Sequence, residues 1–257
     1  MIYFIGAGPG APDLITVRGA ELLKQAGMII YAGSLVNPAL LEYAPWGCMV
    51  HDSASMTLDE VIDKLLYGYR MGVTTVRLHT GDPSLYGAIR EQMDRLAALR
   101  VPFEVVPGVS SFCAAAAAIP AEYTLPGVSQ TLIISRMEGR TPVPERESIR
   151  SLATHRASMV LFLSTGMLDA LCADLIEGGY PPKTPAALVY RASWPDVPEG
   201  AGEKVLRGTL TDLPALAQEA GITRQALILV GDFLGDEYDL SKLYDGGFSH
   251  GYRQATS

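Results

Sequence analysis

The chain opens with MIYFIGAGPGAPDLITVRGAELLKQA over residues 1–26, and this stretch sets the first question about the fold. The apolar run 2–5 is typical of a buried strand, and a helical pattern follows the glycines. Between them, Gly6, Gly8 and Ala11 fit the G-x-G-x-x-G/A pattern of a dinucleotide-binding loop. Two alternatives follow: a loop that holds a nucleotide phosphate, or a tight turn that needs glycine backbone angles.

Three features of this stretch disfavour a dinucleotide. Pro9 and Pro12 each remove a backbone N–H from the loop that would hold a pyrophosphate. The helix is expected to begin later, with Asp13 or Thr16 as its N-cap. The second strand ends YAGS over 31–34, without the acidic residue that would bind a ribose.

Composition sets the broad class of the protein. The 257 residues are 48% hydrophobic and 19% charged, which fits a folded protein with a substantial core. No apolar run reaches the roughly 18 residues of a membrane span, and we expect no signal peptide and no membrane partner. The net charge of −8 disfavours nucleic acid as a partner. Cys48, Cys113 and Cys172 form no C-x-x-C pair, so we expect free thiols in the cytoplasm.

Apolar runs alternate with helical patterns, which predicts an α/β fold with mostly parallel or mixed sheets flanked by helices. We expect strands at Ile2–Ile5, Met28–Ala32, Thr74–Leu78, Phe103–Val106, Thr131–Ser135, Met159–Leu163, Ala186–Tyr190 and Ala226–Val230. We expect helices at Thr16–Ala26, Thr57–Met71, Gly87–Leu99, Ser110–Ala118, Met167–Gly178 and Thr211–Ala220. The turn-rich stretch 121–130 divides an N-terminal domain, 1–120, from a C-terminal domain, 121–236, in which the looser rhythm predicts a mixed sheet. A tail over 237–257 follows.

Four loops that follow strands are candidate ligand loops, because open α/β sheets bind ligands beyond the carboxyl ends of their strands. They are HTGDPSLYG over 79–87, VPGVSS over 106–111, RMEGRTPVP over 136–144 and YRASWPD over 190–196. Each also has a plainer interpretation as a capped turn or a solvated surface loop. The histidines show no metal-ligand spacing and the carboxylates form no catalytic pair, so we expect no bound metal.

Taken together and in this order, the motifs resemble one enzyme family. The loops GAGPG (6–10), GDP (81–83) and VPGVSS (106–111) are similar to those of the tetrapyrrole (corrin/porphyrin) class of S-adenosylmethionine methyltransferases. Within that class, the chain resembles the precorrin-4 C11-methyltransferases of cobalamin synthesis at YAGSLV (31–36), HTGDP (79–83), EGRTPVP (138–144) and RASWPD (191–196). The tail motifs SKLYD (241–245) and FSHGYR (248–253) look more like the anaerobic, cobalt-precorrin-4 branch.

The resemblance implies a two-domain homodimer of the tetrapyrrole methylase fold, with an active site in the trough between the domains. It implies S-adenosylmethionine as cofactor and a tetrapyrrole as substrate. The cofactor residues that it implies are Pro9, Gly81, Asp82, Pro83, Tyr86, Ser110, Ser111, Phe162, Leu163, Tyr190, Gly208, Thr209 and Ala226.

The reaction expected from the resemblance is methyl transfer to C11 by proximity and orientation, because the methyl on a cationic sulfur is already activated. The substrate's carboxylates need cationic clamps, for which we favour Arg136 and Arg140 over Arg191, Arg77 and Arg18. His79 or Tyr190 is a candidate for moving a proton. The alternatives are methylation of another corrin or porphyrin carbon, an NAD-dependent oxidoreductase, and a tetrapyrrole carrier without catalytic activity.

Overall fold

A computed structural model describes residues 1–255 of the chain. Residues 256 and 257, the end of the tail expected over 237–257, lie outside the described residues. Within 1–255, no helix combines the length and the apolar character that crossing a membrane requires.

The chain forms two compact units. The first contains Met1–Ala118 together with Arg191–Lys204, and the second contains Ile119–Tyr190 and the residues from Val205 onward. The division at Ala118 lies close to the expected junction. The segment 191–204, which we call the strap, differs from the expectation of two continuous domains because it packs with the first unit.

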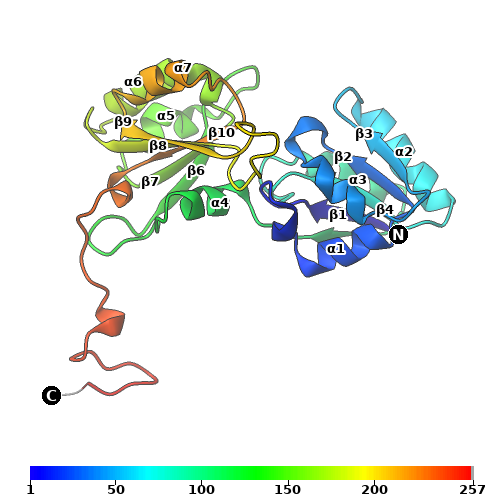
Figure 1. The fold of residues 1–257 in the computed structure, drawn as a ribbon, viewed down its shortest axis with the longest axis horizontal. Helices are drawn as coiled ribbons and strands as arrows, with labels where there is room; N and C mark the ends of the chain where they lie inside the picture. The colour runs from blue at the N-terminus through cyan, green and yellow to red at the C-terminus, as the bar shows by residue number, and fades with distance from the viewer. Residues whose placement is uncertain (256–257) are drawn as a thin grey trace. The chain divides into compact units, whose positions relative to one another are not determined.

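The first unit contains a five-stranded sheet of order β3-β2-β4-β1-β5, and its registered strand pairs are parallel (Figure 1). Its strands are β1 (Ile2–Gly6), β2 (Met28–Tyr31), β3 (Met49–Asp52), β4 (Thr75–His79) and β5 (Phe103–Val106). Its helices are α1 (Val17–Lys24), α2 (Leu58–Arg70), α3 (Ile89–Ala98) and α4 (Ser111–Ala118). Both faces of the sheet bury apolar clusters, as expected for parallel strands.

Alternation along β1 distributes its side chains between the two faces. Ile5 packs in the cluster that includes Leu23 of α1. Ile2 and Phe4 pack in the opposite cluster, which includes residues of α2 and α3. Helix α1 begins after Thr16, whose hydroxyl accepts a hydrogen bond from a backbone N–H of the first turn. This N-cap confirms the expectation that the first helix begins well after the glycines.

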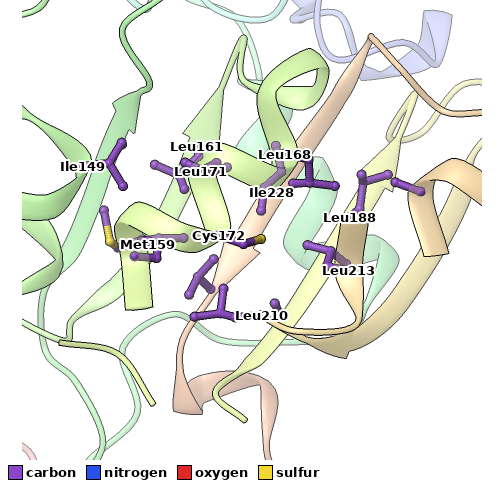
Figure 2. Packing of buried hydrophobic residues seen from close by; sticks show 14 of the residues in the cluster. Ile149, Met159, Leu161, Leu168, Leu171, Cys172, Leu188, Leu210, Leu213 and Ile228 are labelled. Atoms are coloured by element: carbon purple, nitrogen blue, oxygen red, sulfur yellow. The ribbon is translucent and has the colours of Figure 1, made fainter. Parts of the chain in front are cut away.

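The second unit contains a mixed sheet of order β6-β7-β10-β8-β9. Strand β7 is parallel to β6, whereas β10 runs antiparallel to both β7 and β8. Its strands are β6 (Leu132–Arg136), β7 (Ser158–Phe162), β8 (Pro185–Tyr190), β9 (Lys204–Thr209) and β10 (Ala226–Val230). Its helices are α5 (Ile149–Ala153), α6 (Leu168–Glu177) and α7 (Leu213–Glu219). Figure 2 shows the core between this sheet and its helices, where Leu161, Leu171 and Ile228 meet.

The eight strands expected from the sequence are all present, with ends that differ by at most one residue. The expectation missed β3 and β9, which both lie at sheet edges, and the short helix α5. Strand β3 alternates half-buried and exposed residues, and β9 begins with an exposed lysine. Edge strands of this kind lack the continuous apolar run by which the inner strands are recognised.

Candidate functional site

Three loops meet at the carboxyl ends of neighbouring strands in the first unit. Strand β1 lies between β4 and β5, and its residue Gly6 pairs with His79 while Ile5 pairs with Val106. The loops that leave these strands, 6–11, 80–88 and 107–111, therefore start side by side. We call this place the three-loop site. The position agrees with the general location of ligand sites in open α/β sheets.

Glycines let the three loops approach backbone to backbone. Gly8 and Gly81 exchange two hydrogen bonds, of 3.3 Å from the Gly8 N–H and 2.8 Å from the Gly81 N–H. A Cβ atom on Gly6 would lie 2.5 Å from Cα of Gly108, closer than side chains permit. Gly8 and Gly81 also have positive φ, of +77° and +59°, which favours glycine. These glycines are therefore required by packing and backbone angle.

The opening glycine loop is tied to the protein at nearly every peptide. The Ala7 N–H donates to the His79 carbonyl at 2.7 Å, and the Ala11 N–H donates to Oγ of Ser193 at 3.1 Å. The Pro9 carbonyl accepts a hydrogen bond from Nε1 of Trp194 at 3.1 Å, and the Gly10 carbonyl accepts one from Nδ2 of Asn37 at 2.8 Å. The N–H groups of Ala7, Gly8 and Ala11 are therefore not available to a pyrophosphate, which agrees with the proline argument against a dinucleotide.

Asp82 fixes the second loop of the three-loop site. One carboxylate oxygen accepts from the Gly108 N–H at 2.9 Å, and the other accepts from the N–H and the hydroxyl of Ser84 at 2.8 and 2.5 Å. Partial burial raises the pKa of Asp82, but the hydrogen bonds from Ser84 and Gly108 outweigh burial and leave the pKa below its ordinary value. The site therefore carries a negative charge at neutral pH.

The other residues expected in this part of the site lie close by in the chain. Pro83 is buried, whereas Tyr86 is 44% exposed and has a φ of +56° in the left-handed region. Ser110 is buried and Ser111 begins α4, and both lie within 4 Å of the position that a Cβ on Gly81 would take. The structure thus brings the expected residues of the first unit together around Gly81.

His79 does not fit the proton-transfer role expected for it. Its side chain is 3% exposed and stacks on Phe4, with ring centroids 6.1 Å apart. Burial and the neighbouring Arg77 lower its pKa to about 3, so the ring is neutral near pH 7. The strand alternation turns this side chain into the core and away from the loops, so its position does not support that role. Only the His79 carbonyl takes part in the three-loop site.

A second group of expected residues shares one edge of the second sheet. Arg136 pairs with Phe162 at the ends of β6 and β7, and Tyr190 pairs with Ala226 where β8 ends and β10 begins. Leu163 follows β7 directly. We call this the Leu163 edge.

Leu163 is unusual in both backbone and exposure. It has a φ of +53°, and its large apolar side chain is 65% exposed. The residues after it are firmly held, because the Ser164 hydroxyl accepts from the Met137 N–H at 2.8 Å and Thr165 donates to the Ala226 carbonyl at 3.0 Å. Strained, exposed apolar residues on a rigid base are typical of ligand contacts.

Gly208 and Thr209 do not join the Leu163 edge. The Leu210 N–H donates to the carbonyl of Thr184, just before β8 begins, whereas Tyr190 ends β8. The two places are separated by the length of the strand, about 17 Å at the usual rise per residue. The Thr209 hydroxyl also donates to Asp212 at 2.7 Å. The structure therefore does not bring them together with Tyr190 and Ala226, and sequence order does not show which end of a strand a residue occupies.

The two favoured clamp residues, Arg136 and Arg140, differ in the hydrogen bonds that they form within the protein. Arg136 donates to the carbonyls of Thr141 and Pro142, so it stiffens its own loop. Arg140 is exposed in that loop and forms no ion pair or hydrogen bond with residues 1–255.

The three remaining arginines are engaged elsewhere. Arg77 is 6% exposed and donates to Ile30 and Gln92, so it is a core residue and not a clamp. Arg18 pairs with Glu104. Arg191 lies 5.1 Å from the ring of Trp194.

Sequence reasoning missed Asn37 and the strap contacts of Ser193 and Trp194 with the glycine loop. The pair Asn37-Pro38 signals a cap, and its Oδ1 does accept from the Ala39 N–H. The second bond of Asn37, to Gly10, joins residues 27 apart and leaves no local signal. Among residues 1–255, no group of His, Cys, Asp and Glu has the arrangement of a metal site.

Residues 1–214 match the family model described as Tetrapyrrole (Corrin/Porphyrin) Methylases. The chain is 49% identical to a protein of Methanocaldococcus jannaschii named cobalt-precorrin-4 C(11)-methyltransferase. The match extends over 255 residues, which are 99% of this chain and 96% of the relative.

Solved structures agree with the sequence matches. The X-ray structure of a cobalamin biosynthetic enzyme, cobalt precorrin-4 methyltransferase, has a TM-score of 0.87 and 46% identity over 91% of this chain and 96% of its own. Uroporphyrin-III C-methyl transferase from Thermus thermophilus, solved with S-adenyl homocysteine, has a TM-score of 0.72 and 28% identity over 91% of this chain and 98% of its own. These likenesses confirm the two-sheet α/β fold expected from the sequence.

Proposed function

The chain belongs to the tetrapyrrole (corrin/porphyrin) methylase family, and on that premise we propose that it transfers the methyl group of S-adenosylmethionine to C11 of cobalt-precorrin-4. The product is cobalt-precorrin-5, in the anaerobic branch of cobalamin synthesis. The observation that carries the proposal is the likeness over 99% of the chain to a relative named for this reaction. The solved structure of a cobalt precorrin-4 methyltransferase supports the same substrate.

The three-loop site fits a cationic cofactor. Asp82 supplies a negative charge, and Gly81 leaves room that a side chain would take beside Ser110 and Ser111. We propose that Pro9, Gly81, Asp82, Pro83 and Ser110 hold the cofactor there, with Tyr86 and Ser111 beside it. The cofactor supplies a methyl group on a positively charged sulfur, so the chain's own work is binding and orientation. The Leu163 edge, with Phe162, Tyr190 and Ala226, is proposed as an apolar ligand surface.

Within the three-loop site, Asp82 acts mainly by holding loop 80–88 against loop 107–111. Its bonds to Gly108 and Ser84 are made within the protein, so the loops do not need to reorganise when a ligand binds. No proton transfer is assigned to His79, because its ring is buried and neutral.

Isotope transfer tests the reaction directly. The purified protein is incubated with cobalt-precorrin-4 and S-adenosylmethionine that carries a 13C methyl group, and the label is located by mass spectrometry and NMR. One new methyl on C11 is expected. A methyl on another carbon would retain the family and refute the position. A faster reaction with the metal-free substrate would refute the cobalt assignment, and binding of NAD in place of S-adenosylhomocysteine would refute the class.

We propose that Arg140 grips a carboxylate of the tetrapyrrole, because it is exposed and the fold leaves it without a protein partner within 1–255. Arg140→Ala should raise KM for the tetrapyrrole and leave KM for S-adenosylmethionine unchanged. Arg146→Ala is the matched control, because Arg146 is an exposed arginine nearby that pairs with Glu147. Equal KM values for the tetrapyrrole in both variants would refute the clamp.

We also propose that the protein is a cytoplasmic homodimer. The three cysteines are free thiols, which suits a reducing compartment, and the family resemblance supports the dimer. Light scattering after size-exclusion chromatography measures the assembly state, and a mass near 27.5 kDa would refute the dimer.

A further inference from the structure

Gln92 lies inside the first unit, where α3 covers the sheet. Its side chain is 5% exposed, although glutamine is mostly an exposed residue. It makes two hydrogen bonds, one to Arg77 at 3.2 Å and one to the carbonyl of Ala88 at 3.1 Å. It therefore links the strand that leads into loop 80–88 with the residue at which that loop ends.

The orientation of the Gln92 amide follows from its partners. Nε of Arg77 can only donate, so it must face the amide oxygen of Gln92. The Ala88 carbonyl can only accept, so it must face the amide nitrogen. A single amide group thus satisfies a buried donor and an acceptor at the same time.

Arg77 depends on this amide. Its guanidinium is 6% exposed and has no carboxylate partner among residues 1–255. Its bonds go to Gln92 and to the carbonyl of Ile30 on β2. Burial lowers its pKa to about 10, so it remains charged near pH 7. Arg77 and β2 together hold the Gln92 side chain in place.

The Ala88 end of the loop needs such a support. Ala88 has a φ of +49°, and Tyr86 has a φ of +56°, so two side-chain-bearing residues occupy the left-handed region. Each such residue is disfavoured relative to a right-handed conformation. Ala88 is also the N-cap of α3 and has no side-chain cap bond of its own. The Gln92 amide does not cap the N–H groups of the helix, but it holds Ala88 from the core through the Ala88 carbonyl.

We propose that Gln92 is a positioning residue for the cofactor loop. It holds the end of loop 80–88 through the Ala88 carbonyl, while the Gly8–Gly81 pair and Asp82 hold its beginning. Arg77 orients Gln92 and reaches no ligand. This inference rests on the proposed function only in naming loop 80–88 as the loop that holds the cofactor.

Gln92→Glu separates positioning from stability. A glutamate retains an acceptor for Arg77 and adds an opposite charge beside it, but it loses the donor to the Ala88 carbonyl. We expect the urea midpoint to be retained and the Kd for S-adenosylhomocysteine to rise about five- to tenfold, the ratio that one lost hydrogen bond gives. Gln218→Glu, on the exposed side of α7, is the control with the same change of charge.

Amide hydrogen exchange over 84–88 gives a second readout that needs no ligand. Faster exchange in Gln92→Glu at an unchanged urea midpoint supports the proposal. Wild-type exchange and wild-type affinity in that variant would overturn it, and so would a parallel fall of affinity and stability, which indicates a structural role alone. If the wild-type protein does not bind S-adenosylhomocysteine, the proposed function fails, and the exchange rates still decide the role of Gln92.

Discussion

Replacing His79 by phenylalanine should change how the stability of the protein depends on pH. The imidazole is 3% exposed, stacks on Phe4, and its Nε2 has no hydrogen-bond partner within residues 1–255. Burial, and then the charge of Arg77, lower its pKa from 6.5 to about 3. A phenyl ring retains the stacked shape and cannot take up a proton.

The direction in which stability changes with pH follows from proton uptake by His79 in the unfolded chain. Between pH 6.5 and about pH 3, His79 of the unfolded chain binds a proton that the folded protein excludes. The unfolded state is therefore favoured as the pH falls through this window, and the contribution vanishes above pH 6.5. At pH 5 the penalty is about 2 kcal/mol, because pH 5 lies about 1.5 units below the unfolded value and each unit is worth about 1.36 kcal/mol.

Urea denaturation of both proteins at pH 7.5 and pH 5.0 measures the effect. Other groups titrate alike in the two proteins, so their contributions cancel in the comparison. The wild type should lose about 2 kcal/mol more than His79→Phe on acidification. Equal losses would show that His79 is protonated in the folded state, and the account of its burial would then be wrong.

Two further changes test local contacts. Alanine at position 10 would place Cβ 2.1 Å from Cδ1 of Trp194, so Gly10→Ala should cost about 1–3 kcal/mol of unfolding free energy, whereas Gly251→Ala, which meets open space, should cost under about 0.5 kcal/mol. Equal losses of unfolding free energy in the two variants, measured by urea denaturation, would contradict the contact between position 10 and Trp194. Thr57→Ala removes the capping box with Glu60 and should cost about 1 kcal/mol, while Thr57→Ser retains the hydroxyl. Equal thermal midpoints for Thr57→Ala and the wild type would refute the cap.

Much of the fold could be predicted because each inner strand coincides with a continuous apolar run in the sequence. The runs Met28–Tyr31 and Ala226–Val230 are continuous and apolar, since both faces of each strand are covered. The edge strand Lys204–Thr209 has no such pattern and was missed. The capping threonine at position 16 lies beside the helix it begins, so the helix start was also readable.

The site was only partly predictable, because its supports join distant residues. The bond from Ala11 to Ser193 spans 182 positions, and no local pattern signals it. The alternation of Thr75, Arg77 and His79 along one face of β4 is visible in the sequence, but it does not show that this face is buried. Both faces of that strand are buried.

The strap has a consequence for how the protein is made. The opening glycine loop leaves the ribosome well before Ser193 and Trp194, which complete its hydrogen bonds and follow Ala118 by about 75 residues. At a usual synthesis rate, the interval from 118 to 193 lasts roughly 4–15 s. During that time most of the second unit is synthesised, while the first unit still lacks the strap, residues 191–204. A ribosome stalled near residue 150 should therefore hold a nascent chain whose glycine loop is still open to protease.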